Sequence, residues 1–255
     1  MLRIAAASWS GGKDSYLAFH SAYEKGLRIL YTIHMRVEDI ISYHGPLGII
    51  MAQQASLNTI GIVRRTTWSE YEKHFKEILT NLKRIGVEVA VFGDIYIEDH
   101  RRWVERICRE IGIDALEPLW GFDSLENVRR ALNMGVKALI VRVHDREPLS
   151  KHVGRVLDEE VIEDLVREGI DPSGEHGEYH TIVIDAPLFR YRIEIIDGKI
   201  EILSGRIADK TYRYRVFIPT KYRVVDKHGG FKSASQEPKL YNTHPQRLLR
   251  PSTKP

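Results

Sequence analysis

Cysteine and long apolar runs are scarce in this chain of 255 residues, which contains one cysteine, Cys108. A single thiol excludes a disulfide within the chain and any zinc or iron–sulfur site built from several cysteines. Cys108 falls on the apolar face of a helix predicted over residues 99–111, so we expect it to be buried as a small hydrophobic side chain. No apolar run is long enough to cross a bilayer and no signal-peptide segment follows Met1, so we expect a cytoplasmic protein without membrane contact.

A strong net charge of one sign is also absent, since the formal net charge is +3 at pH 7. Residues 226–255 hold six Lys or Arg and two acidic residues, which leaves a net charge of −1 on residues 1–225. A body without an excess of basic residues argues against nucleic acid as a partner. The composition of residues 226–255 predicts a basic, flexible tail.

One short motif carries most of the chemical information in the first half of the chain. Residues 10–15 read Ser-Gly-Gly-Lys-Asp-Ser and stand between an apolar run and a helix-like stretch. Adjacent glycines let backbone N–H groups approach an anion that a Cβ would obstruct, and the start of a helix adds further unpaired N–H groups. The motif therefore predicts a loop that binds polyphosphate, although a surface turn that caps a helix is the simpler alternative.

Strand-like and helix-like segments alternate around this motif. Strands are expected at residues 2–9, 27–35, 62–68 and 87–92, and helices at residues 14–24, 47–59, 69–85 and 99–111, the third opened by a capping box at residues 69–72. This order predicts a doubly wound α/β fold with a parallel, Rossmann-like sheet. Ligands bind such sheets at the carboxyl ends of the strands. Asp94 follows a strand there and is either a site residue or a helix N-cap.

The second half of the chain predicts a smaller α+β domain. Helices are expected at residues 124–135 and 158–168, and strands at residues 136–143, 181–185, 191–196, 199–203 and 212–218, with Asp197-Gly198 as a hairpin turn. We therefore expect a nucleotide-binding domain at residues 1–118, a substrate-binding domain at residues 119–225 and the tail at residues 226–255.

Residues 169–181 form a glycine-punctuated loop with three carboxylates, two imidazoles and a phenol. Functional side chains are often held on such loops, and a solvated polar turn is the plain alternative. His176 and His180 have the spacing of a helical metal-binding pair. Gly177 and the strand that follows argue against a helix there, so this spacing does not predict a zinc site.

Residues 10–15 resemble the PP-loop of the N-type ATP pyrophosphatases, which cleave ATP between the α and β phosphates. Further motifs follow in order: Gly93-Asp94-Ile95, Glu117-Pro118-Leu119-Trp120-Gly121, Gly-Glu-His-Gly-Glu-Tyr-His-Thr at residues 174–181, and Asp-Ala-Pro-Leu-Phe at residues 185–189. With them, residues 3–220 resemble the diphthine–ammonia ligase family, most closely its archaeal members. Ser173 replaces a cysteine that is usual in the family, which excludes a thiol-dependent role at that position.

The resemblance implies an enzyme, an AMP-forming carboxylate–ammonia ligase that uses ATP and Mg²⁺. Its implied partner is translation elongation factor 2, whose diphthine carboxylate would attack the α-phosphate to give an acyl adenylate and pyrophosphate. Ammonia would then displace AMP and leave the amide, diphthamide. Because Cys108 is expected to be buried, a built-in glutaminase has no candidate nucleophilic thiol, and free ammonium is the expected nitrogen source.

The resemblance also assigns roles to residues, without naming a set of metal ligands. Ser10, Gly11, Gly12 and Ser15 would bind the phosphates, and Lys13 would stabilise charge during pyrophosphate release. Asp14 would orient the loop or bind Mg²⁺, and Asp94 would complete the nucleotide end. The residues on the diphthine side would be Glu175, Gly177, Glu178, Tyr179 and His180.

Two alternatives remain open at this point. Another PP-loop ligase, acting on tRNA or a small carboxylic acid, would share the phosphate loop. A regulator that binds ATP without turnover would also need that loop, but not the polar loop at residues 169–181. The oligomeric state, a homo-oligomer included, is left open.

Overall fold

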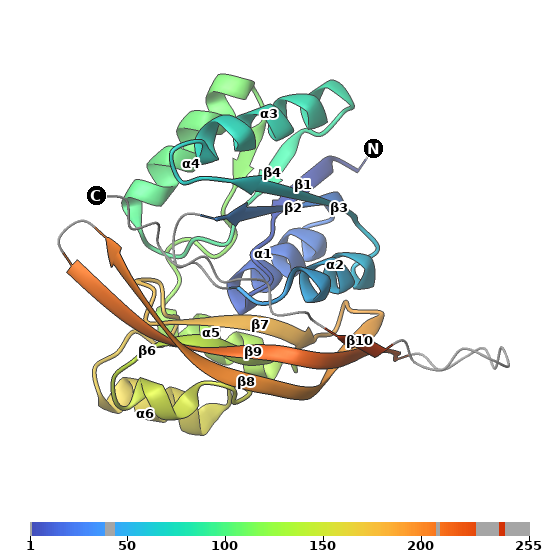
Figure 1. Cartoon of the computed structure of the whole chain (residues 1–255). Coiled ribbons are helices and arrows are strands. Elements are labelled where there is room, and N and C mark those ends of the chain that lie inside the picture. Colours follow the sequence, from blue (N-terminus) through green and yellow to red (C-terminus); the bar gives the residue numbers. More distant parts are fainter. Residues whose placement is uncertain (1, 39–43, 208–209, 228–239, 243–255) are drawn as a thin grey trace, which may run out of the picture.

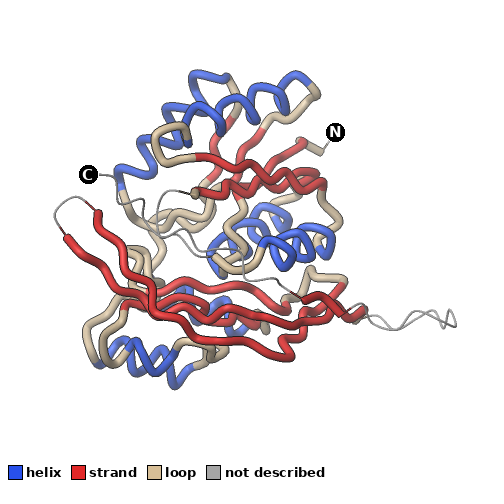
Figure 2. The backbone as a smooth tube through the Cα atoms, in the orientation of Figure 1, coloured by secondary structure: helices blue, strands red, loops and turns tan. Residues whose placement is uncertain are grey.

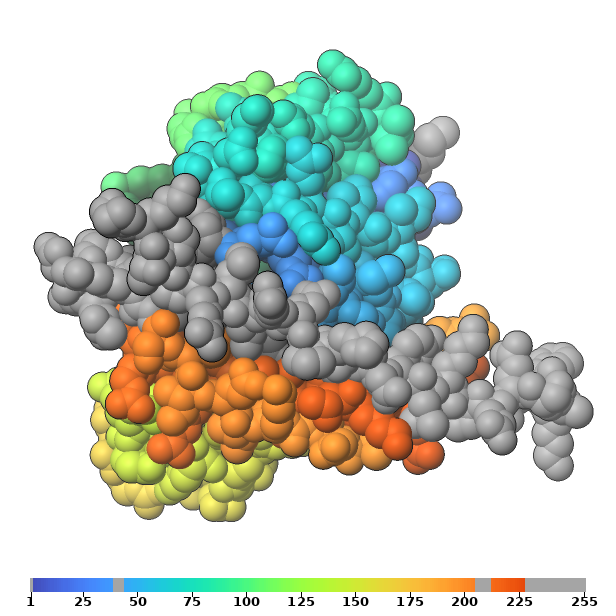
Figure 3. All heavy atoms as spheres, in the orientation of Figure 1, coloured from blue at the N-terminus to red at the C-terminus, as the bar shows by residue number. Residues whose placement is uncertain are grey.

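The computed structural model describes residues 2–38, 44–207, 210–227 and 240–242. Figure 1 shows two sheets, one above the other, with helices between them and on their outer faces. In Figure 3 the earlier part of the chain, blue to green, stacks directly on the later part, yellow to red. Among the described residues, no helix is both long and apolar enough to cross a membrane.

The first sheet is parallel, and its strand order is β3-β2-β1-β4-β5. The strands are β1 (Ile4–Ser8), β2 (Arg28–Val37), β3 (Ile60–Thr66), β4 (Val89–Val91) and β5 (Asp114–Leu116). Helices α1 (Lys13–Glu24) and α2 (Leu47–Ser56) lie on one face, and α3 (Tyr71–Arg84) and α4 (Glu98–Ile111) lie on the other (Figure 1). The doubly wound α/β prediction is confirmed.

Strand β1 is buried on both faces, as its run of small apolar residues requires. Ala5 and Ala7 pack into the core that contains α1, whereas Ala6 packs into the core beneath α3 and α4. Cys108 belongs to this second core and is 1% exposed, so its predicted burial is confirmed. Residues 10–15 follow the carboxyl end of β1, and ligands bind at this edge of such a sheet.

The second sheet is antiparallel, with the order β10-β9-β6-β7 and with β8 paired to β9. Figure 2 shows its strands, in red, side by side below the first sheet. Its strands are β6 (Lys137–His144), β7 (Tyr179–Asp185), β8 (Tyr191–Ile207), β9 (Lys210–Asp226) and β10 (Leu240–Asn242). Helices α5 (Ser124–Asn133) and α6 (Glu159–Arg167) and the 3₁₀ turn Leu149–His152 complete this part. One continuous core joins residues of α1 and α2 to residues of β6 and β7.

The predicted hairpin turn at Asp197-Gly198 is wrong, because both residues lie inside the single strand β8. Pairing with β9 passes from Ile195 to Asp197, so Ile196 is an extra, bulged residue. A Cβ on Gly198 would lie 2.3 Å from Cζ of Phe217. The glycine therefore serves close packing of an aromatic ring, a role that the dipeptide alone does not distinguish from a turn.

Two smaller differences from the prediction concern the start of α3 and the strand β5. The capping box at residues 69–72 does not form: α3 has Glu70 at its N-cap without a side-chain hydrogen bond, and Ser69 contacts Thr67 instead. Strand β5 was not predicted, since three residues carry too little pattern to recognise.

The predicted tail at residues 226–255 falls outside the described residues except at residues 226–227 and 240–242, and β10 pairs with β9 there. The division of the chain into these three parts stays a prediction.

Candidate functional site

The predicted phosphate loop, residues 10–15, leaves the carboxyl end of β1 and enters α1 directly. Gly11 has φ +87°, and a Cβ on it would lie 2.4 Å from Cδ1 of Ile50, so glycine is required there both by conformation and by space. Gly12 is the N-cap of α1, and its N–H donates to Oγ of Ser10 (3.2 Å). Oγ of Ser15 donates to the Gly12 carbonyl (2.9 Å). These contacts fix the shape of the loop at the start of α1.

Gln53, on α2, fastens this loop to the second sheet. Its Nε2 donates to the carbonyls of Gly11 (3.0 Å) and Val183 (2.6 Å), and its Oε1 accepts from Nε1 of Trp9 (3.0 Å). The Val183 N–H also donates to the Gly11 carbonyl (2.8 Å). Because Gln53 is fully buried, these bonds are shielded from water, and the position of the loop depends on strand β7.

Lys13 points its ammonium group into the interior rather than into solvent. The side chain is 3% exposed, and Nζ lies 2.9 Å from Oδ2 of Asp14 and donates to the Ser173 carbonyl. Nζ also lies 5.0 Å from the centroid of the Tyr179 ring. Burial lowers the pKa of Lys13, but Asp14 and Tyr179 together raise it more, so the amine stays protonated. Oδ1 of Asp14 is buried without a hydrogen-bond partner among the described residues and is available to a ligand.

Asp94 lies at the switch point of the parallel sheet, where β1 and β4 are neighbours and connections leave in opposite directions. A Cβ on Gly93 would lie 3.0 Å from the Asp14 carbonyl group, which shows how closely the two loops approach. Oδ1 of Asp94 lies 3.0 Å from Nδ1 of His100, and this hydrogen bond raises the pKa of His100. The N-cap of α4 is Ile97, so Asp94 is not the helix cap.

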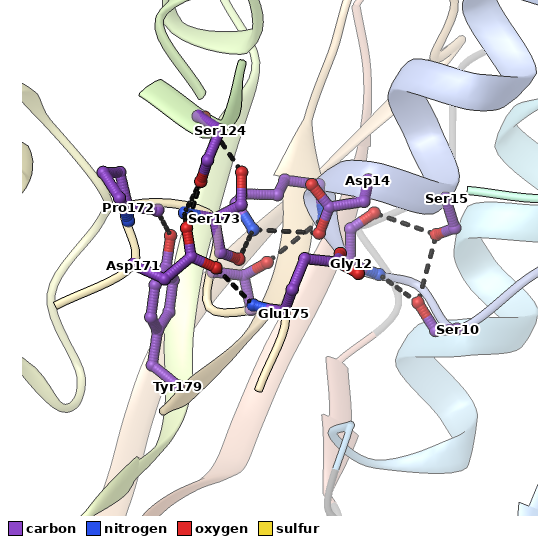
Figure 4. A network of polar contacts seen from close by, with 12 residues as sticks. Ser10, Gly12, Asp14, Ser15, Ser124, Asp171, Pro172, Ser173, Glu175 and Tyr179 are labelled. Atoms are coloured by element: carbon purple, nitrogen blue, oxygen red, sulfur yellow. Dashed lines mark hydrogen bonds and ion pairs between the residues drawn. The ribbon is translucent and has the colours of Figure 1, made fainter. Parts of the chain in front are cut away.

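Asp171 organises the loop of the second sheet (Figure 4). Its carboxylate accepts hydrogen bonds from the N–H groups of Ser173 (3.2 Å) and Glu175 (2.8 Å), from the Tyr96 hydroxyl (3.0 Å) and from the Ser124 hydroxyl. Burial pushes the pKa of Asp171 up, but these hydrogen bonds outweigh burial and hold the pKa below its usual value. Asp171 thus remains ionised and fixes the backbone that carries Glu175.

Ser173, which the resemblance predicts to replace a cysteine, is 2% exposed. Its N–H donates to Oγ of Ser124 (2.9 Å) and its hydroxyl donates to the Ser124 carbonyl (3.0 Å). Its own carbonyl receives the hydrogen bond from Lys13. The side chain therefore joins the loop to the start of α5, while its backbone holds the lysine of the phosphate loop.

Two carboxylates of the loop differ in their surroundings. Figure 4 shows the Glu175 side chain reaching from its loop toward Gly12 and Asp14. Burial, and next the negative charge of Asp14, raises the pKa of Glu175 to about 8. Glu178 buries its Oε2 atom, which has no hydrogen-bond partner among the described residues. A buried carboxylate oxygen without a partner is costly, so a cationic ligand would be favoured there.

Tyr179 and His180 are held by neighbours on the second sheet. The Tyr179 hydroxyl donates to the Pro172 carbonyl (2.5 Å), and burial raises the pKa of Tyr179 to about 12. An NH2 group of Arg142 lies 2.7 Å from Nε2 of His180. Since a guanidinium only donates, Nε2 must accept, which leaves His180 neutral with its proton on Nδ1.

His44 stacks on His180 with ring centroids 4.4 Å apart. Burial, and then the charge of Arg142, lowers the pKa of His44 to about 3, so this imidazole is neutral as well. The carbonyl of Gly177 accepts a second hydrogen bond from Arg142 (3.2 Å). His176 turns away and meets the ring of Tyr96. In the described part of the chain, no three His, Cys, Asp or Glu residues gather as metal ligands.

The structure brings both predicted halves of the site to one place, since Lys13 bonds to Ser173 and Thr181 as well as to Asp14. Several residues of this site were not predicted: Gln53, Ser124, Arg142 and Asp171. A lone Arg in an apolar strand and a Gln on an apolar helix were usable signals, because polar groups in such settings need buried partners. Ser124 and Asp171 carried no comparable signal.

Comparisons with known proteins agree on one family. Residues 3–115 match the family model "Diphthamide synthase N-terminal domain", and residues 123–213 match "Diphthamide synthase C-terminal domain". Diphthine–ammonia ligase of Homo sapiens is 27% identical over 233 residues, which are 80% of this chain and 86% of that protein. The Schizosaccharomyces pombe protein of the same name is 31% identical over 138 residues, which are 52% of this chain and 22% of that longer protein.

One solved structure is also similar. It is described as the predicted subunit of a tRNA methyltransferase from Methanocaldococcus jannaschii, with a TM-score of 0.42 and 17% identity over 72% of this chain and 98% of that one.

Proposed function

We propose that this chain converts the diphthine carboxylate of translation elongation factor 2 to the amide. The chain belongs to the diphthine–ammonia ligase family of ATP-dependent ligases. The observation that carries the proposal is the direct bond between the two halves of the site, from Nζ of Lys13 to the Ser173 carbonyl. A phosphate loop and a carboxylate-rich loop that share one lysine suit a reaction in which nucleotide and acyl substrate must meet.

The chemistry explains why two halves are needed. A carboxylate oxygen is a poor leaving group, so ammonia does not displace it unaided. Attack of the carboxylate on the α-phosphate of ATP releases pyrophosphate and gives an acyl adenylate. Ammonia then displaces AMP, a much better leaving group, and forms the amide.

The nucleotide half uses the backbone and the first turn of α1. We propose that Ser10, Gly11, Gly12 and Ser15 bind the phosphates, and that Lys13 stabilises the charge that develops on pyrophosphate as it leaves. The buried, protonated state of Lys13 supports this role, because a fixed charge acts more strongly where water is excluded. Asp94 would complete the nucleotide end.

Mg²⁺ is assigned here to the nucleotide rather than to a resident site. The ion usually keeps several waters and binds one or two carboxylates together with the phosphates of a substrate. The described residues offer no group of three ligands, which fits Mg²⁺ that enters with ATP. Of the two roles expected for Asp14, we propose orientation of the loop, because its Oδ2 already binds Lys13.

The diphthine half is assigned to residues 175–180. Glu178 would pair with the trimethylammonium group of diphthine through its buried oxygen. Tyr179 faces Lys13 with its ring and bonds Pro172 with its hydroxyl, so we propose that it positions the lysine. We assign the neutral His180 to contact with the substrate, and Gly177 supports it through Arg142.

The test is mass spectrometry of elongation factor 2 carrying diphthine, incubated with this protein, ATP and ammonium. Conversion of the carboxyl to the amide lowers the mass by about one unit, since OH is replaced by NH₂. Phosphorus NMR should show AMP and pyrophosphate in equal amounts with the amide, and an Asp14→Ala variant should lose all three. AMP formed with tRNA but not with the factor would favour the tRNA ligase, and ATP that stays intact with every substrate would favour the regulator.

A further inference from the structure

Glu175 stands apart from the other acids of the site by its position between the two halves. Its backbone N–H is fixed by Asp171 (2.8 Å), and its side chain extends toward Gly12 and Asp14, where the nucleotide would lie (Figure 4). The side chain is partly buried and no hydrogen bond or ion pair commits its carboxylate within the described residues. The carboxylate therefore lies beside the loop proposed to bind the phosphates and is available for chemistry.

We propose that Glu175 is the proton acceptor that converts bound ammonium to ammonia at this site. The inference rests on the proposed function, because it concerns the second half of that reaction. The role of proton acceptor replaces, for Glu175, an electrostatic role toward the trimethylammonium group. Glu178 is the better placed carboxylate for that electrostatic role.

Ammonium gives one proton to the Glu175 carboxylate, and the nitrogen lone pair so released attacks the acyl carbon of the adenylate. The bond from that carbon to the phosphate oxygen breaks, and AMP leaves with the bonding electrons. The nitrogen loses a second proton to solvent, so one ammonium and one acyl adenylate give one amide, one AMP and two protons.

The charges around Glu175 suit a base that works near neutral pH. Burial, and then Asp14, raises the pKa of Glu175 to about 8, which brings it closer to the pKa of ammonium than an ordinary carboxyl group. The charged and titratable groups that face Glu175 come from the phosphate loop, the loop after β4, helix α4 and its own loop: Lys13, Asp14, Asp94, Tyr96, His100 and Asp171.

The experiment separates the two half-reactions in a Glu175→Gln variant. Exchange of labelled pyrophosphate into ATP in the presence of diphthine-bearing elongation factor 2 reports adenylation, which needs no ammonia. We expect this exchange to stay within about threefold of wild type, while amide formation from ammonium falls about a hundredfold or more. Hydroxylamine is largely unprotonated at neutral pH and needs no base, so hydroxamate formation should stay within about threefold of wild type.

The pH profile gives a second readout. The rate of the variant should follow the concentration of free ammonia, rising about tenfold per pH unit until the pH reaches the pKa of ammonium. The wild-type rate should stop rising at a lower pH than this, near pH 8, where Glu175 becomes ionised. Glu163→Gln is the matched control, since Glu163 is exposed on α6.

Three outcomes would overturn the inference, and they differ from failure of the proposed function. Loss of pyrophosphate exchange in Glu175→Gln, or failure of hydroxylamine to react, would place Glu175 in adenylation or substrate binding. An unchanged rate with ammonium would show that no proton passes through it. If the wild-type protein forms neither adenylate nor amide, the proposed function itself is wrong, and this inference falls with it.

Discussion

The two loops that meet at Lys13 are built in opposite ways. Residues 10–15 are shaped by the backbone: a positive φ at Gly11, an extended N-cap at Gly12 and the start of a helix. Residues 171–181 are shaped by side chains, above all by Asp171. A backbone-built loop can be recognised from a short motif, whereas a loop built by side chains depends on partners that are distant in sequence.

The difference also separates chemical roles. A backbone cradle recognises phosphate, which is common to many ligases, so it says little about the second substrate. The side-chain loop presents carboxylates and the imidazole of His180, whose Nε2 accepts a hydrogen bond from Arg142. Specificity for the second substrate is therefore expected in residues 171–181, the loop whose shape depends on side chains.

The strongest test of this comparison removes the charge that joins the loops. In Lys13→Met we expect pyrophosphate release to fall about a thousandfold, because a preorganised charge beside the leaving group is lost. Lys25→Met is the control, since Lys25 is exposed at the end of α1. A decrease of less than tenfold in a folded Lys13→Met protein would contradict the role given to this lysine.

Backbone dependence predicts a large loss of stability in Gly11→Ala. The alanine would have to adopt φ +87° and would meet Cδ1 of Ile50 at 2.4 Å, so the free energy of unfolding should fall by about 2–4 kcal/mol. Gly135 has φ +80°, and a Cβ added there would have no atom within 4 Å, so Gly135→Ala should lose only about 1–2 kcal/mol. Denaturant unfolding of both variants measures the difference, and equal losses would show that space around Gly11 does not matter.

Much of the fold was predictable because its signals are local. Alternating apolar strands and helices with glycine stops predicted the parallel sheet, and the face of α4 predicted the burial of Cys108. Asp197-Gly198 misled because a tight turn and a strand packed closely against Phe217 demand the same small residue. Local sequence does not say which neighbour a glycine accommodates.

The candidate site was predictable to a smaller extent. The members of both loops were named from motifs, but their connections were not: Gln53 binds across 130 residues to Val183, and Ser173 binds across 49 residues to Ser124. Such contacts follow from how the two sheets stack. They require a structure, because many buried polar pairings are compatible with one sequence.

The side-chain loop predicts a pH dependence that the backbone loop lacks. The pKa of Glu175 rises from 4.5 to about 8 in the folded protein, so the folded state keeps a proton that the unfolded state loses between these values. Stability should therefore decrease as the pH rises from about 4.5 to 8, by less than about 1.4 kcal/mol per unit because the group is partly exposed. Glu175→Gln should remove this decrease, which urea unfolding at a series of pH values would detect. A variant whose stability curve runs parallel to that of wild type and of Glu163→Gln would show that Glu175 ionises normally.

The smallest effect is expected at Ser173, where the resemblance predicts a departure from the usual cysteine. The Ser173 carbonyl that binds Lys13 belongs to the backbone, and only the hydroxyl bond to the Ser124 carbonyl depends on the side chain. Ser173→Cys should therefore cost about 1 kcal/mol of stability, the worth of one hydrogen bond, and leave pyrophosphate release within about threefold of wild type. Ser204→Cys, at an exposed position of β8, controls for the thiol itself. A much larger rise or fall in release with Ser173→Cys would mean that this side chain acts on the reaction directly, and that the loop contributes more than the backbone bond by which it holds Lys13.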